Sequence, residues 1–144
     1  MDRVDTATRS RMMAAIRGKD TEPEMIVRRF LHRRGYRYRL HRKDLPGKPD
    51  LVLPRLKVCI FVHGCFWHRH SGCAFATTPS TRLDFWSEKF KKNVARDLAN
   101  IDALEAAGWS VLIVWECQLK RGLDTLERLD QKLRLLDSTR SASH

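Results

Sequence analysis

The sequence has no uninterrupted apolar segment that approaches the roughly 20 residues of a membrane-spanning helix. Its first residues, MDRVDTATRSRMM, also lack the apolar core of a secretory signal. With four cysteines and no such signal, metal ligation is favoured over disulfides. Acidic residues are few, 17 against 28 Lys and Arg, which leaves a formal charge of +11. Such an excess favours a polyanionic partner, nucleic acid before an acidic membrane surface.

The pattern of apolar residues predicts one domain of mixed secondary structure, without internal repeats. We expect a basic arm over residues 1–20, a folded domain over 21–137 and a disordered tail over 138–144. Within the domain, helices are predicted at 21–35, 84–108 and 123–136, and strands at 36–40, 49–53, 58–62 and 109–115. The last two strands are continuous apolar runs, typical of strands buried on both faces. This order predicts an α/β fold with a central mixed sheet flanked by helices on both sides.

Cysteines and histidines gather where the two apolar strands end. Cys65, His70 and Cys73 lie in one loop, and Cys117 follows the second strand. Zinc is bound by about four nitrogen or sulfur ligands in a tetrahedron, and a closed set of four is structural rather than catalytic. We therefore predict a structural zinc site. The spacing lacks the paired CxxC units that would be more specific, so ordinary reduced cysteines are the alternative; Cys59, in mid-strand, is expected in the core.

Asp50 follows a proline at the start of a strand, which is half of the PD-(D/E)xK arrangement of many nucleases. The second acid–x–Lys unit is absent, and residues 61–63 (FVH) stand in its place. A single carboxylate such as Asp50 could bind magnesium together with water and phosphate. A histidine, for which His68 is the best candidate, could then deprotonate the attacking water. Taken alone, Asp50 is better explained as a turn residue, but the charge of +11 and the nearby histidines favour the nuclease interpretation.

Large aromatic residues stand beside these groups. In a basic protein, Phe66, Trp67 and Trp86 could stack on bases or wedge between base pairs. Packing in the core is the alternative, and it is the stronger interpretation for Trp109 and Trp115 within their strand.

Several blocks together resemble a known family. They are Pro49-Asp50, HGCFWH at 63–68, Trp86, NVARD at 93–97 and WEC at 115–117. From about Arg9 to Arg121 the chain closely resembles the very short patch repair endonucleases of bacteria. The resemblance implies a restriction-endonuclease-like, PD-(D/E)xK-related fold. It also implies a magnesium-dependent, strand-specific nick 5′ to the thymine of T:G mismatches, which arise when 5-methylcytosine deaminates.

The resemblance also implies roles for individual residues. Asp50 and the Val62 carbonyl would bind magnesium, His68 would be the general base, and His63 would lie near the scissile phosphate. Asp97 and Glu24 would support the histidine and the metal-bound water; a capping box with Thr21 is the other interpretation of Glu24. The zinc ligands would be Cys65, His70, Cys73 and Cys117, the wedge would be Phe66, Trp67 and Trp86, and the basic arm would grip DNA from the opposite groove.

Two departures and two rival functions accompany this resemblance. Another member has threonine where this chain has Val62, and Ser71-Gly72 separates His70 from Cys73 by one extra residue. A zinc-containing module that binds mismatched or methylated DNA without catalysis is the main alternative, and a toxin or homing-type nuclease that cuts matched duplexes is the other. For the mismatch enzyme we expect a monomer in the bacterial cytoplasm, associated with the nucleoid, with mismatch-repair proteins as possible helpers.

Overall fold

The computed structural model describes residues 21–70, 73, 76–77, 79–122 and 124–142, without the side chains of residues 66, 67 and 140–142. Two compact units make up the chain, Met1–Arg37 and Tyr38–His144. The predicted arm, residues 1–20, lies outside the described residues, and the boundaries at 21 and 137 stay predictions. Among the helices described, none is both long and apolar enough to cross a membrane.

The first unit contains α2 (Glu22–Arg33), which confirms the helix predicted at 21–35. Thr21 caps it, because its Oγ1 accepts a hydrogen bond from the Glu24 backbone N–H at 3.4 Å. The Glu24 carboxylate instead accepts from the Arg28 guanidinium at 3.4 Å, one turn along the helix. Gly35 follows the helix with φ +83, a conformation that favours glycine.

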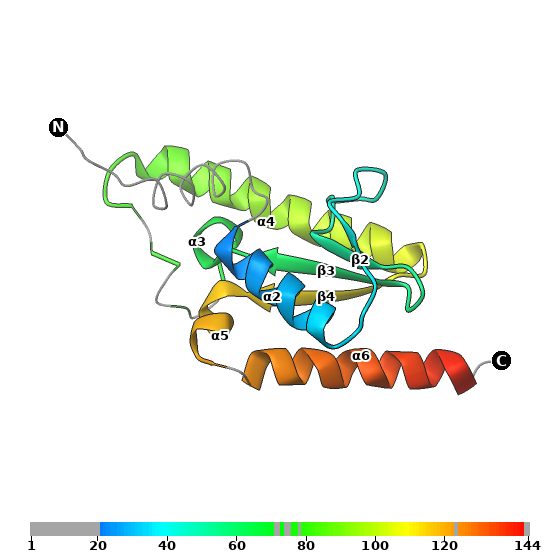
Figure 1. The fold of residues 1–144 in the computed structure, drawn as a ribbon. Helices are drawn as coiled ribbons and strands as arrows, with labels where there is room; N and C mark the ends of the chain where they lie inside the picture. Colours follow the sequence, from blue (N-terminus) through cyan, green and yellow to red (C-terminus); the bar gives the residue numbers. More distant parts are fainter. Residues whose placement is uncertain (1–20, 71–72, 74–75, 78, 123, 143–144) are drawn as a thin grey trace. The chain divides into compact units, whose positions relative to one another are not determined.

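The second unit is built on a four-stranded mixed sheet (Figure 1). Its strands are β1 (Arg39–Leu40), β2 (Leu51–Leu53), β3 (Val58–His63) and β4 (Ser110–Trp115), in the spatial order β1-β2-β3-β4. The first two pairings are antiparallel and β3 pairs with β4 in parallel. The predicted mixed sheet is therefore confirmed. β1 begins at Arg39 rather than at residue 36, so it is shorter than predicted. It ends at Leu40 as predicted, and His41 follows in the left-handed region (φ 49).

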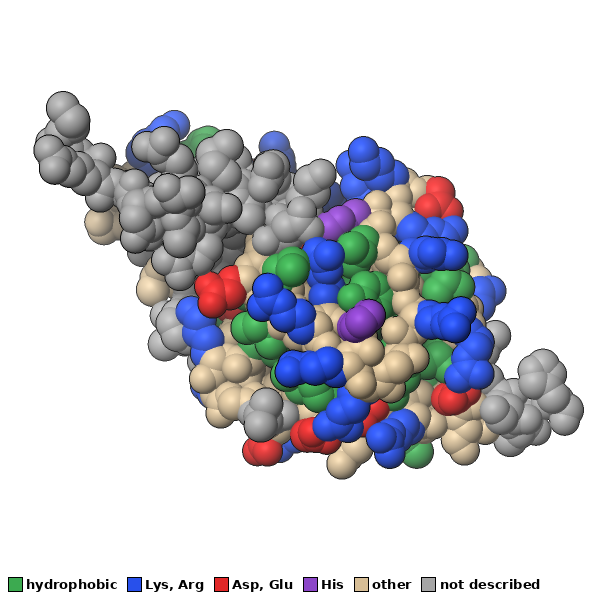
Figure 2. Space-filling view, in the orientation of Figure 1, with side chains coloured by type: hydrophobic (Ala, Val, Ile, Leu, Met, Phe, Trp, Pro, Cys, Tyr) green, Lys and Arg blue, Asp and Glu red, His purple; other side chains and the backbone are tan. Residues whose placement is uncertain are grey.

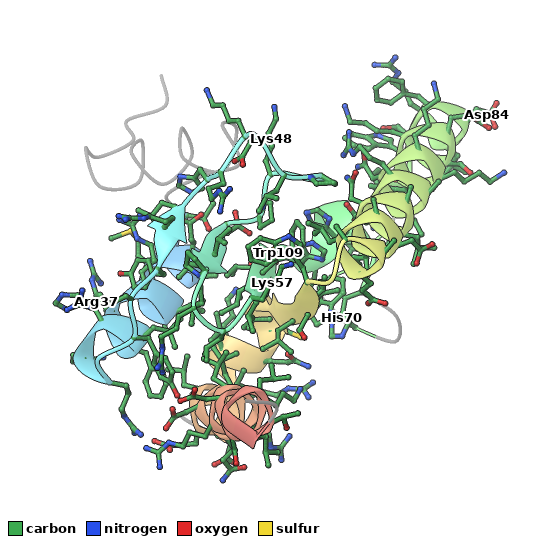
Figure 3. The ribbon with its side chains drawn as sticks, turned by 90° about the vertical axis from the view of Figure 1, so that its right-hand side faces the viewer. Arg37, Lys48, Lys57, His70, Asp84 and Trp109 are labelled. Carbon is green, nitrogen blue, oxygen red and sulfur yellow. The ribbon has the colours of Figure 1, made fainter. Side chains whose placement is uncertain are left out.

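The two apolar strands differ in burial. Five of the six β3 residues are buried, whereas only Val114 is buried in β4. The prediction that both strands are buried on both faces is thus wrong for β4, which is the last strand in the sheet order. Trp109 precedes β4 and packs against the core cluster of Val52, Cys59, Phe61 and Leu104. Lys57 Nζ lies 5.7 Å from the centroid of the Trp109 ring (Figure 3), so the two side chains make a cation–π contact.

Helices cover both sides of this sheet, as predicted. α4 (Leu83–Ala106) contributes Leu104 to the core cluster, and α6 (Asp124–Ala142) runs along the opposite side (Figure 1). α6 continues through Ser138 as far as Ala142. Its helical course is supported by the ion pair of Asp137 with Arg55 at 3.1 Å and by the Thr139 hydroxyl, which donates to the Leu135 carbonyl.

Two short helices were not predicted. α3 (Cys65–His68) begins two residues after β3, and α5 (Glu116–Lys120) begins directly after β4. Both turns occupy the positions from which the candidate metal and catalytic side chains project. Their brevity explains why no helical repeat marks them in the sequence.

Candidate active site and metal centre

The candidate site lies where the parallel pair β3 and β4 ends. The register of this pair closes with His63 opposite Trp115. Beyond these residues, each chain turns at once into a short helix, α3 or α5. Because parallel strands end at the same edge of a sheet, the residues after both strands meet there. The fold therefore brings the residues after His63 to Cys117, as the sequence predicted.

The first group at this edge, the Cys/His cluster, comprises Cys65, His70, Cys73 and Cys117. One ligand atom from each lies within 4.8 Å of the others. His70 Nδ1 is 3.7 Å from the Cys65 sulfur and 3.3 Å from the Cys117 sulfur. A tetrahedral zinc ion with Zn–S of about 2.3 Å and Zn–N of about 2.0 Å would separate such atoms by about 3.6 Å. The four residues thus fit a cation that prefers thiolate and imidazole.

Burial shapes the chemistry of this cluster. It raises the pKa of the Cys65 thiol well above its ordinary value, so that without a cation the sulfur holds its proton. A bound zinc ion would displace this proton and take the thiolate as ligand. Metal binding at the cluster is therefore expected to release protons and to stabilise the fold.

Arg69 secures the loop that carries the cluster. It stands directly after α3 in the left-handed region, with φ 54. Its guanidinium donates to the carbonyls of Ala76 at 3.1 Å and Thr77 at 2.8 Å, and it lies 4.0 Å from the centroid of the Phe90 ring on α4. These contacts fasten the chain after α3 to α4, so the loop does not depend on a metal alone.

The second group, the histidine–aspartate cluster, comprises His63, His68 and Asp97. His68 Nδ1 lies 2.6 Å from Asp97 Oδ2, and the His63 ring stacks on the His68 ring with centroids 3.8 Å apart and planes 4° from parallel. A carboxylate only accepts hydrogen bonds, so the proton belongs on Nδ1 of His68 and leaves Nε2 as the basic nitrogen. This is the arrangement that a general base requires.

His63 is held in its uncharged form. Its side chain is buried, and its Nδ1 has no hydrogen-bond partner within the described part of the chain. Burial first, and the neighbouring His68 second, lower its pKa from 6.5 to about 4, although Asp97 acts in the opposite direction. At neutral pH, His63 therefore offers a hydrogen-bonding ring rather than a positive charge.

Asp50 lies beside the end of β3. The last β2–β3 pair joins Leu51 to Ile60, and beyond it the Val62 N–H donates to the Asp50 carboxylate at 2.7 Å. A ring nitrogen of His41 and an Asp50 carboxylate oxygen lie within 4.8 Å of each other. His41 lies between the strands predicted at 36–40 and 49–53 and received no role from the sequence, since nothing in its spacing indicates that it would lie beside Asp50 after β1.

Trp115 and Glu116 are the other functional candidates that sequence reasoning missed. Trp115 was expected in the core, but its ring is only partly buried and lies 4.2 Å from that of His70, almost parallel to it. The Glu116 carboxylate accepts the Cys65 backbone N–H at 3.0 Å. Both residues belong to the WEC block, so their presence in that block was the available signal.

Trp86, Phe66 and Trp67 were predicted to form the aromatic wedge. Trp86 is half-buried on α4, with its ring 5.3 Å from that of Phe85 and 5.6 Å from that of Phe90. Phe66 and Trp67 lie within α3, but their side chains are outside the described residues. The proposed roles of these aromatic residues and of Glu24 stay predictions.

Positive charge is widespread on the protein. Figure 2 shows Lys and Arg side chains spread over much of the visible face, with Asp and Glu in fewer places. This distribution agrees with the formal charge of +11. A surface of this kind attracts the phosphate backbone of nucleic acid.

Comparisons with known proteins agree with this chemistry. Residues 1–74 match the family model described as DNA mismatch endonuclease Vsr. The chain is 52% identical over 118 residues to the type II nicking enzyme V.XorIIP of Xanthomonas oryzae pv. oryzae, covering 82% of this chain and 86% of that protein. It is 46% identical over 131 residues to the DNA mismatch endonuclease Vsr of Escherichia coli (strain K12), covering 90% and 83%. The chain is a DNA endonuclease that belongs to the DNA mismatch endonuclease Vsr family.

Proposed function

We propose that this endonuclease makes a magnesium-dependent nick in one strand, 5′ to the thymine of T:G mismatches produced by deamination of 5-methylcytosine. The nick would initiate very short patch repair. The observation that carries the proposal is the contact of His68 with Asp97 at 2.6 Å, close to the end of the strand that Asp50 contacts. The mixed sheet, with Asp50 at the start of β2, supports a restriction-endonuclease-like fold.

Asp50 would hold the magnesium ion, together with the backbone carbonyl of Val62. The 2.7 Å hydrogen bond from Val62 N–H to the Asp50 carboxylate supports this pairing, because it keeps the two residues adjacent. Magnesium prefers oxygen ligands, and a site with a single protein carboxylate would leave room for water and phosphate oxygens. When bound, the ion would neutralise charge on the scissile phosphate.

His68 would act as the general base. Its Nε2 takes a proton from water while Asp97 holds Nδ1–H and balances the charge of the imidazolium that forms. The water oxygen attacks phosphorus, and the P–O bond to the 3′ oxygen breaks. That oxygen takes up a proton, so the products are a 5′-phosphate and a 3′-hydroxyl. His63, uncharged and stacked on His68, would lie beside the scissile phosphate. Glu24 would support the water on the metal.

The other predicted residues would hold the enzyme on its substrate. Phe66, Trp67 and Trp86 would open the base stack beside the mismatch, and the basic arm over residues 1–20 would grip the opposite groove. Zinc in the Cys/His cluster would fix the turn that carries Phe66, Trp67 and His68. The fit of that cluster to tetrahedral ligand distances supports zinc over a harder cation.

Duplexes labelled on either strand, matched or with one T:G pair, test the proposal with and without magnesium. We expect a single nick, only in the thymine strand of the mismatched duplex and only with magnesium. Asp50→Ala and His68→Ala should abolish nicking while DNA binding persists. Magnesium-independent DNA binding with no nick would instead identify a non-catalytic binding module. Cleavage of the matched duplex would identify a toxin or homing-type nuclease.

A further inference from the structure

Trp115 lies between the two clusters of the site. As the last residue of β4, it stands opposite His63, the last residue of β3. Its ring is stacked on the His70 ring, with centroids 4.2 Å apart and planes 10° from parallel. It also meets the His63 ring edge-on, at 5.1 Å and 73°. One indole therefore contacts a residue of the Cys/His cluster and a residue of the histidine–aspartate cluster.

These contacts join the clusters into a continuous array of rings. His63 stacks on His68 at 3.8 Å, so the order is His70, Trp115, His63, His68. At one end, His70 Nδ1 faces the sulfurs of the Cys/His cluster, and at the other His68 Nδ1 faces Asp97. Closely packed side chains do not move independently, because a gap between them forfeits dispersion energy. A change in the orientation of the His70 ring is therefore expected to change the orientation of the His68 ring.

The residue after Trp115 provides a second connection. The Glu116 carboxylate accepts the backbone N–H of Cys65, 51 positions earlier in the chain, at 3.0 Å. Cys65 is the first residue of α3, and His68 is the last. The Trp115 backbone N–H is itself fixed, since it donates to the Gln118 side chain at 3.3 Å. The turn from β4 into α5 thus holds the start of the helix that carries the proposed base.

We propose that Trp115 is a positioning residue through which metal bound at the Cys/His cluster sets the orientation of His63 and His68, with Glu116 holding the start of α3. This inference rests on the proposed function only for its effect on nicking. If metal merely fastened the loop locally, the indole could be removed without consequence for the histidine–aspartate cluster.

The kinetic test compares Trp115→Ala and Trp115→Phe with Trp109→Phe as the matched control. Trp109 directly precedes β4, at the end opposite to Trp115, and packs against the core cluster, away from both clusters of the site. Loss of residues that orient metal ligands typically lowers activity by about 10- to 100-fold, which is the expected fall in kcat for Trp115→Ala. KM for DNA should be unchanged, because the role proposed for the indole is to position His63 and His68 rather than to bind DNA. Trp115→Phe, which keeps a stacking ring, should recover much of kcat.

The second readout does not need activity. In metal-free protein, addition of zinc should shift the NMR signals of the His63 and His68 rings. The shift should be lost in Trp115→Ala and reduced in Glu116→Ala, but kept in Glu116→Gln, whose amide oxygen can still accept the Cys65 N–H. Zinc content is measured on every variant, so loss of the metal is separated from loss of the coupling.

Two results would overturn the inference. One is a zinc-loaded Trp115→Ala protein whose kcat equals that of the wild type and whose His63 and His68 signals still show the full zinc-induced shift. The other is a wild-type protein in which zinc leaves both ring signals where they were. If Trp115→Ala does not fold, Glu116→Ala compared with Glu116→Gln answers the same question. A wild-type protein whose ring signals respond to zinc but which nicks no T:G duplex would refute the proposed function and leave the coupling standing.

Discussion

Replacement of Asp97 by asparagine probes the proposed base most directly. The change keeps the size of the side chain and removes its negative charge. In the native site, Oδ2 lies 2.6 Å from His68 Nδ1, and the carboxylate can only accept. The amide of the variant can turn its NH2 group toward the ring and favour the proton on Nε2. The nitrogen that should accept a proton from water is then already protonated.

The size of the effect follows from the exposure of the pair. The side chains of His68 and Asp97 are 26% and 19% exposed, so their hydrogen bond is partly screened by solvent. A general base contributes about 10²- to 10⁴-fold, and for this partly exposed pair we expect the lower end, a fall of about 100-fold in kcat. That fall corresponds to about 2.7 kcal/mol of transition-state stabilisation. Affinity for DNA should change little, since a carboxylate does not attract phosphate.

Single-turnover nicking of a T:G duplex measures this effect, with enzyme in excess over DNA. Asp102→Asn is the matched control, because Asp102 is an exposed residue of the same helix and loses the same charge. The control should nick at the wild-type rate. If Asp97→Asn also stayed within twofold of the wild type, His68 would not depend on Asp97 and the assignment of the base would be wrong.

Three further perturbations test the metal, the buried histidine and the fold. Cys117→Ser removes one of four ligands and should lower zinc content by elemental analysis and the Tm; equal zinc content would contradict the site. The pKa of His63 is lowered from 6.5 to about 4, so its contribution to stability is complete above pH 6.5 and is lost as the pH falls toward 4. Urea unfolding of metal-free protein should follow this loss, by at most about 3 kcal/mol, and a His63→Gln variant should show a flatter dependence. Gly47→Ala, at φ +75, places a Cβ 2.9 Å from that of Asn100. Gly35→Ala, at φ +83, has open space and should lower the free energy of unfolding by roughly 1–2 kcal/mol, so Gly47→Ala should lower it by more. Equal losses of stability would argue against the clash.

The two interleaved sites show how far local sequence reasoning reaches. Cys65, His68 and His70 are close in the chain, so their types and spacing alone indicate that one turn supplies both thiol and imidazole. What the spacing does not reveal is that the turn is helical, since four residues are too few for a repeat. The last residue of this helix, His68, contacts Asp97, 29 positions away. His70 lies beyond the left-handed Arg69 that ends the helix, and it faces the sulfurs.

Contacts between distant residues account for what was missed. The partner of Trp115 is set by the register of β3 and β4, and that register depends on the whole sheet rather than on the residues near the tryptophan. An apolar run such as WSVLIVW predicts a strand but does not say whether the strand is central or last in the order. Because β4 is last, its final tryptophan is free to lie over His70 instead of in the core.

The strands, the long helices, the members of the Cys/His cluster and the excess of positive charge could all be predicted from the sequence. These depend on side-chain chemistry and on periodicities of a few residues, which local propensity and burial enforce. The tertiary structure alone decided the pairing of His68 with Asp97, the hydrogen bond of Val62 to Asp50 and the ring array through Trp115. These contacts form only when separated segments are packed against each other, because they join side chains whose distance is fixed by strand order and register.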